Sequence, residues 1–255
     1  MGQYPEEFLD RLHLVWGVGF LSPGGAEEVG AIVKGLELTG AAVLDIGCGT
    51  GGPAQVLARG KGAKVTGIDV EPQVVERAKS LAAPAGLSDA LSFQLVEPGP
   101  LPFADASFDA VFSKDSLLHI PDKPALYKEV LRVLKPGGVF AASDWLAGED
   151  AAEDAALKRY IEMIGLDFTL ATAEQTAAAM RAAGFEEVAT GDRNAWYAEV
   201  SAEEVAAIEG PLRDEVIAVS SEEIYDRWLN ARRALAEAVA HGALRPTHLR
   251  GSRPR

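Results

Sequence analysis

The fold of this chain is decided by the stretch Val43-Leu44-Asp45-Ile46-Gly47-Cys48-Gly49-Thr50-Gly51-Gly52. Its first residues suit a buried strand, and they run directly into a turn that contains four glycines. Residues 53–58 follow, and their composition predicts the start of a helix. A strand, loop and helix in this order leave a loop without side chains that would keep a ligand from its backbone. The first helical turn also offers unpaired N–H groups to a polar or anionic group. The stretch therefore predicts a cradle for a small molecule.

The composition limits the class of protein. The 255 residues are 48% hydrophobic, a share typical of a globular chain with one sizeable core. We expect neither a membrane span nor a signal peptide, because no apolar run approaches the ~18 residues that cross a bilayer and no basic segment precedes an apolar one at the N-terminus. One cysteine leaves no pair for an intrachain disulfide and fits a cytoplasmic location.

The charge disfavours nucleic acid as a partner. With 24 basic and 38 acidic residues the net charge is −14, which would repel a phosphate backbone unless a strong local basic patch existed. The only basic cluster lies between residues 245 and 255, and we expect most of its charge to belong to a solvated chain end.

Apolar strand-like runs alternate with helical patterns in the first half of the chain. We expect strands at 42–46, 64–69, 91–96, 110–113 and 139–144, and helices around 54–58, 72–81 and 123–133. Such alternation predicts an α/β fold with a parallel sheet that helices cover on both faces. After Trp145 the pattern becomes mostly helical, with expected helices in 149–183 around a break at 168–170 and a long helical run from about 202 to 240. Strands are expected at 187–190 and, as an open alternative to the solvated end, at 244–253.

These patterns predict one domain with an embellishment. Its parts are N-terminal lid helices in residues 1–35, a cofactor-binding core in 36–148, and a helical cap with the final strands in 149–255.

The glycine loop alone does not identify its ligand. Gly47, Gly49 and Gly52 satisfy the G-x-G-x-x-G pattern of dinucleotide-binding proteins, so an NAD-dependent oxidoreductase is a real alternative. Asp69 lies 22 residues after Gly47, at the end of the second expected strand. A carboxylate at that place would bind ribose hydroxyls in either class of protein.

Further segments match one family in order and spacing. They are Gly67-Ile68-Asp69-Val70, Leu101-Pro102-Phe103 with Ser107-Phe108-Asp109-Ala110-Val111, and Leu131-Arg132-Val133-Leu134-Lys135-Pro136-Gly137-Gly138. Together with the glycine loop they make residues 40–145 resemble the class I S-adenosylmethionine-dependent methyltransferases. The resemblance implies a Rossmann-like, seven-stranded, mostly parallel sheet whose last strand is antiparallel, and S-adenosyl-L-methionine as the cofactor.

The resemblance also implies which residues face the methionine part of that cofactor. Gly47, Gly49 and Gly51 would lie against it, while Ser113 and Lys114 at the end of the fourth strand would form the floor. Cys48, inside the loop, is expected to be a small packing residue.

On the adenosine side the resemblance implies a second group. Asp69 would hold the ribose hydroxyls, with Val70 beside the adenine. Glu97, followed by Pro98 at the end of the third strand, would meet the adenine amino group, although this pair also fits an ordinary turn. Asp45 would contact the cofactor or only orient the loop.

The flanks resemble the phosphoethanolamine N-methyltransferase family. The matching segments are Phe20-Leu21-Ser22-Pro23-Gly24-Gly25, Ser113-Lys114-Asp115-Ser116-Leu117-Leu118-His119-Ile120 and Ser143-Asp144-Trp145. In that family an N-terminal segment folds over the cofactor, and a tyrosine there pairs with the histidine of the fourth-strand motif. His119 matches this histidine, Asp115 matches the aspartate four residues before it, and Tyr4 is the candidate partner. Leu21 and Ser22 would contact the cofactor from the lid.

These residue types suit methyl transfer to nitrogen. The reaction needs a neutral nucleophile that is held close and dehydrated, whereas an amine is mostly protonated at neutral pH. His119 can take a proton near pH 7, and Asp115 can hold the ammonium form while the substrate docks. We therefore predict an S-adenosylmethionine-dependent methyltransferase that acts on a small amine, with His119, Asp115 and Tyr4 as catalytic residues and no metal.

The expected substrate pocket departs from the phosphoethanolamine family. That family holds phosphate with an arginine and tyrosines after the fifth strand, but here apolar residues replace the basic one and Asp167 would repel phosphate. A substrate without phosphate is therefore favoured, although Arg232 or Arg233 could supply positive charge. Aromatic side chains could line a more apolar pocket with cation–π contact to an amine, or simply pack in the core. They are Trp16, Trp145, Tyr160, Phe168 and Trp196.

Other functions stay open. They are C- or O-methylation of a natural-product scaffold with His119 as the base, oxidoreduction with NAD, and cofactor binding without catalysis. The segment Ser113-Lys114-Asp115-Ser116 lacks the Asn/Asp-Pro-Pro-aromatic motif of enzymes that methylate base amines, which also disfavours a nucleic-acid substrate. The sequence does not indicate the oligomeric state.

Overall fold

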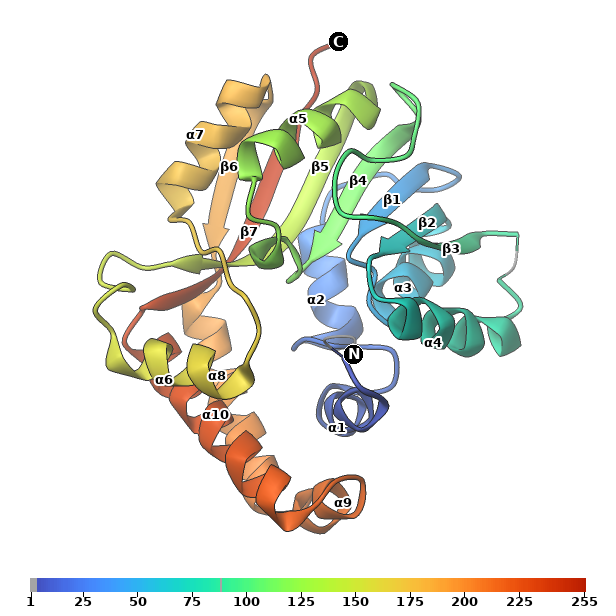
Figure 1. Ribbon diagram of the computed structural model, residues 1–255. Helices are drawn as coiled ribbons and strands as arrows, with labels where there is room; N and C mark the ends of the chain where they lie inside the picture. The colour runs from blue at the N-terminus through green and yellow to red at the C-terminus, as the bar shows by residue number, and fades with distance from the viewer. Residues whose placement is uncertain (1–3, 88) are drawn as a thin grey trace.

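The described residues form one mixed sheet with helices on both faces (Figure 1). The structure is a computed structural model that describes residues 4–87 and 89–255. Within this part of the chain the sheet has seven strands in the order β3-β2-β1-β4-β5-β7-β6, and only β7 is antiparallel to its neighbours. The strands are β1 (Ala42–Ile46), β2 (Lys64–Asp69), β3 (Leu91–Leu95), β4 (Phe108–Lys114), β5 (Leu134–Ala147), β6 (Glu186–Asp192) and β7 (Leu244–Ser252). The predicted α/β sheet is confirmed.

Alternate residues of the inner strands build a core on each face. Val43 belongs to a cluster with α2 (Gly25–Ile32), α3 (Gly52–Lys61) and α4 (Pro72–Ala82), whereas its neighbour Leu44 belongs to a cluster with α5 (Lys123–Val133) and α7 (Ala173–Ala183). Apolar residues on both sides of a strand are what a parallel sheet covered on two faces requires. A short 3-10 helix, η1 (Ala83–Ala85), follows α4, and a second, η2 (Leu117–His119), follows β4.

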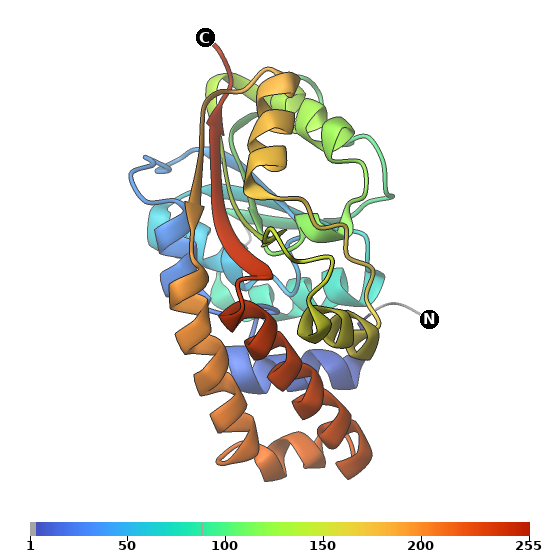
Figure 2. The ribbon, with the colours of Figure 1, turned by 90° about the vertical axis from the view of Figure 1, so that its left-hand side faces the viewer.

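The carboxyl ends of the parallel strands face a group of helices with its own core (Figures 1 and 2). This group comprises α1 (Glu6–Trp16), α6 (Ala155–Ile164), α8 (Asn194–Glu209), α9 (Arg213–Ala218) and α10 (Glu222–Ala240). α10 packs against both α6 and α8. Trp145 of β5 joins the α6–α8–α10 cluster, and Leu12 of α1 joins a cluster with Trp228 of α10. Segments from both ends of the chain therefore meet over one edge of the sheet.

The helical run predicted from about 202 to 240 is divided into several helices. The segment contains three helices, which begin earlier, at Asn194, and break around Gly210-Pro211 and at Ser221. Proline lacks the N–H that a continuing helix would use. Ser221 begins α10 as its N-cap, because its side chain accepts a hydrogen bond from the N–H of Ile224.

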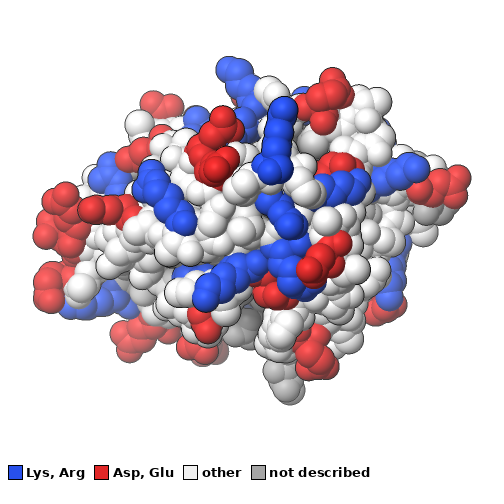
Figure 3. Space-filling model, turned by 90° about the horizontal axis from the view of Figure 1, so that it is seen from above, with Lys and Arg blue, Asp and Glu red and all other residues white. Residues whose placement is uncertain are grey.

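The expectation that residues 245–255 form mostly a solvated end is wrong. β7 lies between β5 and β6, and its arginines have partners. Arg245 pairs with Asp192 at 2.7 Å, and Arg250 donates to the backbone oxygen of Ile32 at 2.8 Å. Arg253 donates to the carbonyl of Arg132 near the end of α5 at 3.0 Å. Figure 3 looks down on the end of the molecule where the chain finishes, and Lys and Arg gather near its centre among scattered Asp and Glu.

In the described residues no helix combines the length and the apolar character needed to cross a membrane.

Candidate active site

The glycine loop after β1 packs against the end of β2 and needs its glycines. The N–H groups of Gly47 and Cys48 both donate to the carbonyl of Ile68, at 2.9 and 3.0 Å. Gly47 has φ +69°, and a Cβ there would lie 2.2 Å from the hydroxyl of Ser116. Gly49 has φ +54°, and a Cβ there would lie 3.1 Å from the side chain of Leu21. Both positions combine a left-handed backbone with no room for a side chain. Gly51 is the N-cap of α3.

Two carboxylates, the half-buried Asp69 and the buried Asp45, lie beside this loop. Asp69 accepts hydrogen bonds from the N–H groups of Gly49 and Glu71, both at 3.1 Å, and burial raises its pKa. Asp45 is 1% exposed, its Oδ2 has no hydrogen-bond partner among the described residues, and burial raises its pKa to about 8. The cradle is therefore rich in acceptors, which suits a ligand with hydroxyl donors or positive charge and opposes a phosphate.

Two apolar side chains are exposed next to Asp69. Val70 is 48% exposed, and Leu95, the register partner of Asp69 on β3, is 50% exposed. Exposed aliphatic side chains beside the carboxylate predicted to bind ribose would provide a surface for a flat ring. Leu95 was absent from the sequence prediction because its strand gave no sign of which face would stay open. Glu97 and Pro98 lie exposed in the loop beyond the end of β3.

Several contacts join the N-terminal segment to the core. Nζ of Lys114 donates to Oγ of Ser22 at 2.6 Å and to the carbonyl of Pro23 at 2.8 Å. The N–H of Gly52 donates to the carbonyl of Gly19 at 2.9 Å. These bonds fix the segment that contains Leu21 over the glycine loop. Ser22 and Lys114, both predicted to contact a cofactor, are bonded to each other.

Asp115 lies just past the end of β4 and is held from two sides. Its Oδ2 accepts from Nζ of Lys114 at 2.7 Å, and its Oδ1 accepts from the hydroxyl of Ser143 at 2.6 Å. The residue has φ +53°, a region that non-glycine residues seldom occupy and that often marks functional sites. Ser113, two residues earlier, is fully buried and donates to the carbonyl of Ile46 at 2.7 Å.

His119 ends η2 with one ring nitrogen bound and the other available. Its Nδ1 lies 3.0 Å from the backbone carbonyl of Asp167. A carbonyl can only accept, so Nδ1 bears the proton and Nε2 of the neutral ring is free to take another. Burial lowers the pKa of the imidazole, which keeps it neutral near pH 7. Asp167 itself is exposed and contributes its carbonyl to this contact.

Two buried charged residues, Asp144 and Lys123, bind the backbone of η2. Oδ1 of Asp144 accepts from the N–H of Leu118 at 3.1 Å, and Nζ of Lys123 donates to the carbonyl of Leu117. Oδ2 of Asp144 has no partner in the described part of the chain, and burial raises the pKa of this carboxyl to about 7. The pair fixes the short helix that contains His119, a role that the sequence had not indicated.

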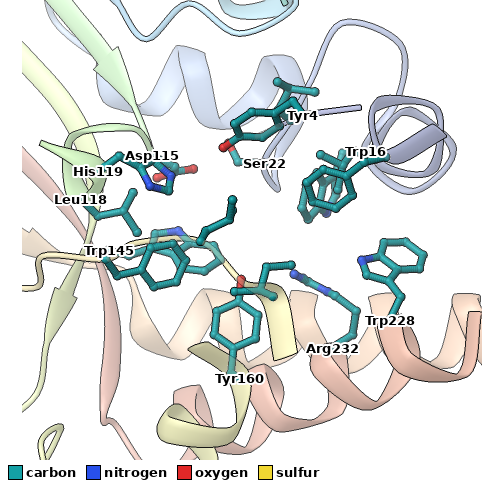
Figure 4. Close-up of a pocket in the computed structure, with 16 residues that line it drawn as sticks. Tyr4, Trp16, Ser22, Asp115, Leu118, His119, Trp145, Tyr160, Trp228 and Arg232 are labelled. Carbon is teal, nitrogen blue, oxygen red and sulfur yellow. The ribbon is translucent and has the colours of Figure 1, made fainter. Parts of the chain in front are cut away.

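One pocket brings the predicted catalytic and substrate residues together (Figure 4). Its cavity has a volume of about 60 Å³. Tyr4 enters from the N-terminal segment, and Figure 4 shows its hydroxyl pointing toward Asp115 and His119. Burial raises the pKa of this phenol, so it stays protonated at neutral pH. The lining residues are Tyr4, Phe8, Leu12, Trp16, Leu21, Ser22, Asp115, Leu118, His119, Trp145, Tyr160, Ile164, Leu166, Phe168, Trp228 and Arg232.

Of the other residues weighed from the sequence, Arg232 lines this pocket and three do not. Trp196 packs under the guanidinium of Arg193, 4.6 Å from the ring centre. Arg233 is exposed and pairs with Glu209. The carboxylate of Asp167 is not part of the lining, and its effect on a phosphate stays a prediction. Phe8, Leu12 and Trp228 were missed, because helices distant in sequence bring them together.

The part of the chain that the structure describes contains no group of three or more His, Cys, Asp or Glu side chains placed to hold a metal ion.

Comparison with known proteins gives one consistent family. A family model described as a methyltransferase domain matches residues 38–179. The chain is 34% identical over 226 residues to phosphoethanolamine N-methyltransferase 3 of Arabidopsis thaliana, an alignment that covers 88% of this chain and 45% of that protein. It is 38% identical over 151 residues to the sterol 24-C-methyltransferase ERG6B of Gibberella zeae, which covers 58% of this chain and 40% of the relative. The chain thus spans less than half the length of these curated relatives.

A solved structure extends the likeness to nearly the whole chain. Phosphoethanolamine N-methyltransferase 2 of Haemonchus contortus, in complex with phosphomonomethylethanolamine and S-adenosylhomocysteine, superposes with a TM-score of 0.91 at 25% identity. The superposition covers 99% of this chain and 59% of that one.

Proposed function

Because this chain belongs to the class I S-adenosylmethionine-dependent methyltransferases, we propose that it transfers a methyl group from S-adenosyl-L-methionine to the nitrogen of a small amine. The observation that carries the proposal is the convergence of Tyr4, Asp115 and His119 in one pocket next to the glycine loop. The acceptor at nitrogen is inferred from this pocket, since the chain covers only part of its relatives.

The residues around the glycine loop fit this cofactor. S-adenosyl-L-methionine supplies an electrophilic methyl group on a positively charged sulfonium. The acceptors of Asp69 suit its ribose hydroxyls better than a pyrophosphate, and the unpartnered Oδ2 of the protonated Asp45 adds a polar partner without adding charge. Gly47 and Gly49 let Ser116 and Leu21 pack directly against the loop, which would fix the backbone that lies against the cofactor, with Gly51 and Ser113 nearby.

The remaining predicted cofactor residues divide into two groups. Val70 would lie against the adenine together with Leu95, and Glu97 and Pro98 would border it. Lys114 and Ser22 would hold the N-terminal segment closed, because all three donors of the Lys114 ammonium already have acceptors.

The pocket can then prepare an amine. Asp115 has two of its roughly four acceptor positions occupied, so an ammonium group can donate to the others. Nε2 of His119 takes one proton from this ammonium and leaves a neutral amine, while Nδ1–H stays on the carbonyl of Asp167. Tyr4 remains a phenol and orients the amine with its hydroxyl. Trp145 and Phe168 exclude water and face the cation with their rings.

Methylation at carbon or oxygen is the second candidate function. The sterol C-methyltransferase relative and the aromatic lining favour it, with His119 as the base for a carbon or hydroxyl nucleophile. The cavity of about 60 Å³ holds roughly four to six water-sized groups, which a small amine fills and a sterol exceeds. Size therefore supports the amine.

The proposed function gives each part of the chain a role. We propose that residues 1–35 form a lid, 36–148 the cofactor-binding core, and 149–255 a cap with the final strands. The substrate is a small molecule, and the single buried cysteine supports a cytoplasmic location.

Calorimetry and mass spectrometry test the proposal. The full chain is titrated with S-adenosyl-L-methionine and with NAD, and is then incubated with the sulfonium cofactor and a panel of small amines, alcohols and carbon acids. We expect binding of the sulfonium and N-methyl products. Binding of NAD alone, or methyl transfer only to oxygen or carbon, would refute it.

A further inference from the structure

Arg232 is a buried cation at the far side of the pocket from Asp115 (Figure 4). It lies on α10 and is 3% exposed. Its Nη2 donates to the hydroxyl of Tyr197 at 3.1 Å and to the carboxylate of Glu204, and its guanidinium lies 5.1 Å from the ring centre of Trp16. Glu204 also accepts from Nε1 of Trp16 at 2.6 Å. The cation is thus fixed, and its charge is balanced, by a carboxylate on α8.

Part of this guanidinium still lacks a partner. Nε of Arg232 is buried and has no hydrogen-bond acceptor among the described residues. Nearly all buried donors in folded proteins are bonded to protein, water or ligand, because an unpaired one is unfavourable. Arg232 lines the pocket and its head group points into it, and Nη1 has no hydrogen bond to the described residues yet is not among their sealed, unpartnered atoms. Nη1 is therefore the donor that an acceptor in the pocket can reach.

The charges around the pocket cancel in pairs. Asp115 is paired with Lys114 at 2.7 Å, and Arg232 is paired with Glu204. His119 adds no charge near pH 7, because burial lowers its pKa. A ligand whose own charges balance keeps this neutrality. A phosphate dianion would bring negative charge that no unpaired cation of the described lining meets.

We propose that the substrate is a small zwitterion, an amine that also bears a carboxylate. Its nitrogen lies at Asp115 and His119, and its carboxylate accepts from Nη1 of Arg232. A carboxylate is the acceptor that a guanidinium binds best, since both are charged and planar. The cavity of about 60 Å³ has the size of a short amino acid such as N-methylglycine or β-alanine. This substrate class rests on the proposed N-methylation.

The proposed substrate class can be tested without turnover by measuring ligand binding to the full chain loaded with S-adenosylhomocysteine. Trp16, Trp145 and Trp228 line the pocket, so tryptophan fluorescence reports occupancy. We expect N-methylglycine and β-alanine to bind roughly 10- to 100-fold more tightly than their amides, which keep the amine and lose the negative charge. Phosphoethanolamine is expected to bind more weakly than either acid.

Two variants assign the preference to Arg232. Arg232→Gln is expected to abolish the preference of the acid over the amide. Since this change leaves Glu204 buried without its cation, Glu204→Gln serves as the second variant, because glutamine still accepts from Trp16 and releases the charge of Arg232. Glu204→Gln is expected to raise the affinity for phosphoethanolamine, relative to the amino acid, by about tenfold or more. Arg233→Gln is the matched control, an exposed neighbour outside the pocket.

Equal binding of acid and amide by the parent chain would overturn the proposal, as would an acid preference that survives Arg232→Gln. The proposal would also be overturned if Glu204→Gln did not raise the affinity for phosphoethanolamine relative to the amino acid. Mass spectrometry of the same mixtures reports the proposed function separately. A bound amino acid that is never methylated refutes N-methylation and leaves the carboxylate site standing. If amines are methylated but bind with the same affinity to Arg232→Gln as to the parent chain, the carboxylate site is refuted and N-methylation stands.

Discussion

The cofactor end and the substrate end of this site are built in different ways. The cradle is made mainly of backbone and of residues close in sequence, where Gly47, Gly49 and Asp69 follow two adjacent strands. The pocket is made of side chains from Tyr4 on the N-terminal segment to Arg232 on α10. A backbone cradle can be recognised from local conformation, whereas a pocket assembled by helix packing depends on the whole fold. Binding of the cofactor and choice of the substrate should therefore be separable by mutation.

The largest expected effect tests the substrate end alone. His119→Asn keeps a polar side chain and removes the base, so we expect kcat/KM for the amine to fall by about 10²- to 10⁴-fold while the affinity for S-adenosyl-L-methionine stays unchanged. In the parent chain burial lowers the pKa of His119, so activity should persist below pH 6.5 and fall only when the imidazole gains a proton. The variant should lack this acidic limb in its pH profile.

His241→Asn is the control for that experiment, since this exposed histidine pairs with Asp154 away from the pocket. Full turnover by the His119 variant would show that the substrate end works without a base.

The next effect tests the cofactor end. Gly47→Ala places a Cβ 2.2 Å from the hydroxyl of Ser116 at a φ of +69°, so we expect the affinity for S-adenosylhomocysteine to fall roughly 100-fold by calorimetry. Gly60→Ala in α3, where a Cβ meets nothing within 4 Å, should bind as the parent does. If both variants bound S-adenosylhomocysteine equally well, the cofactor site would not depend on the backbone conformation at Gly47.

A smaller effect concerns the buried carboxylate of the cradle. Burial raises the pKa of Asp45 from 3.8 to about 8, so the folded state holds this proton more tightly than the unfolded state. The resulting contribution to stability is complete below about pH 4 and is lost as the pH rises toward 8, by about 1.4 kcal/mol per pH unit at most. In thermal unfolding, Asp45→Asn should reduce this loss of stability with rising pH. The same variant should bind S-adenosyl-L-methionine about tenfold more weakly.

Asp214→Asn, on the exposed surface of α9, should leave both the pH dependence and the affinity unchanged. A parent chain whose stability does not decline between pH 5 and 8 would argue against a protonated Asp45.

The smallest effect tests the connection between the two ends. Arg77 on α4 pairs with Glu6 at 3.3 Å and with Asp10, both on α1. Because these pairs are partly exposed, Arg77→Ala should weaken cofactor binding by only about two- to fivefold, and the difference should shrink in high salt. Arg59→Ala, exposed on α3, is the control. A loss much larger than fivefold would mean that the N-terminal segment contributes far more to the cradle than these contacts suggest.

What the sequence could predict follows the same division. The strand–loop–helix unit at Gly47 and the family of the chain are confirmed, because short-range periodicity and glycine placement determine them. A strand at the place of β7 (Leu244–Ser252) was only an open alternative in the sequence, because the strands that it pairs with are distant in the chain. Leu95 and Trp228 gave no local signal at all.

The buried charges were the least predictable part of the site. Arg232 was weighed as a source of charge, but its neutralisation by Glu204 depends on how α8 packs against α10. Asp144 stood in a matching motif, yet its bond to the N–H of Leu118 comes from the turn of η2 over β5. The assignments of Tyr4, Asp115 and His119 remain predictions that only measurements on variants can decide.

The most direct measurement of the central claim uses S-adenosyl-L-methionine with a carbon-13-labelled methyl group. After incubation with the full chain and a small amino acid, the carbon-13 NMR spectrum of the product reports the atom that received the label. We expect a labelled methyl group bonded to nitrogen, absent when His119→Asn replaces the parent chain. A label on oxygen or carbon, or an unlabelled amino acid beside bound cofactor, would contradict it.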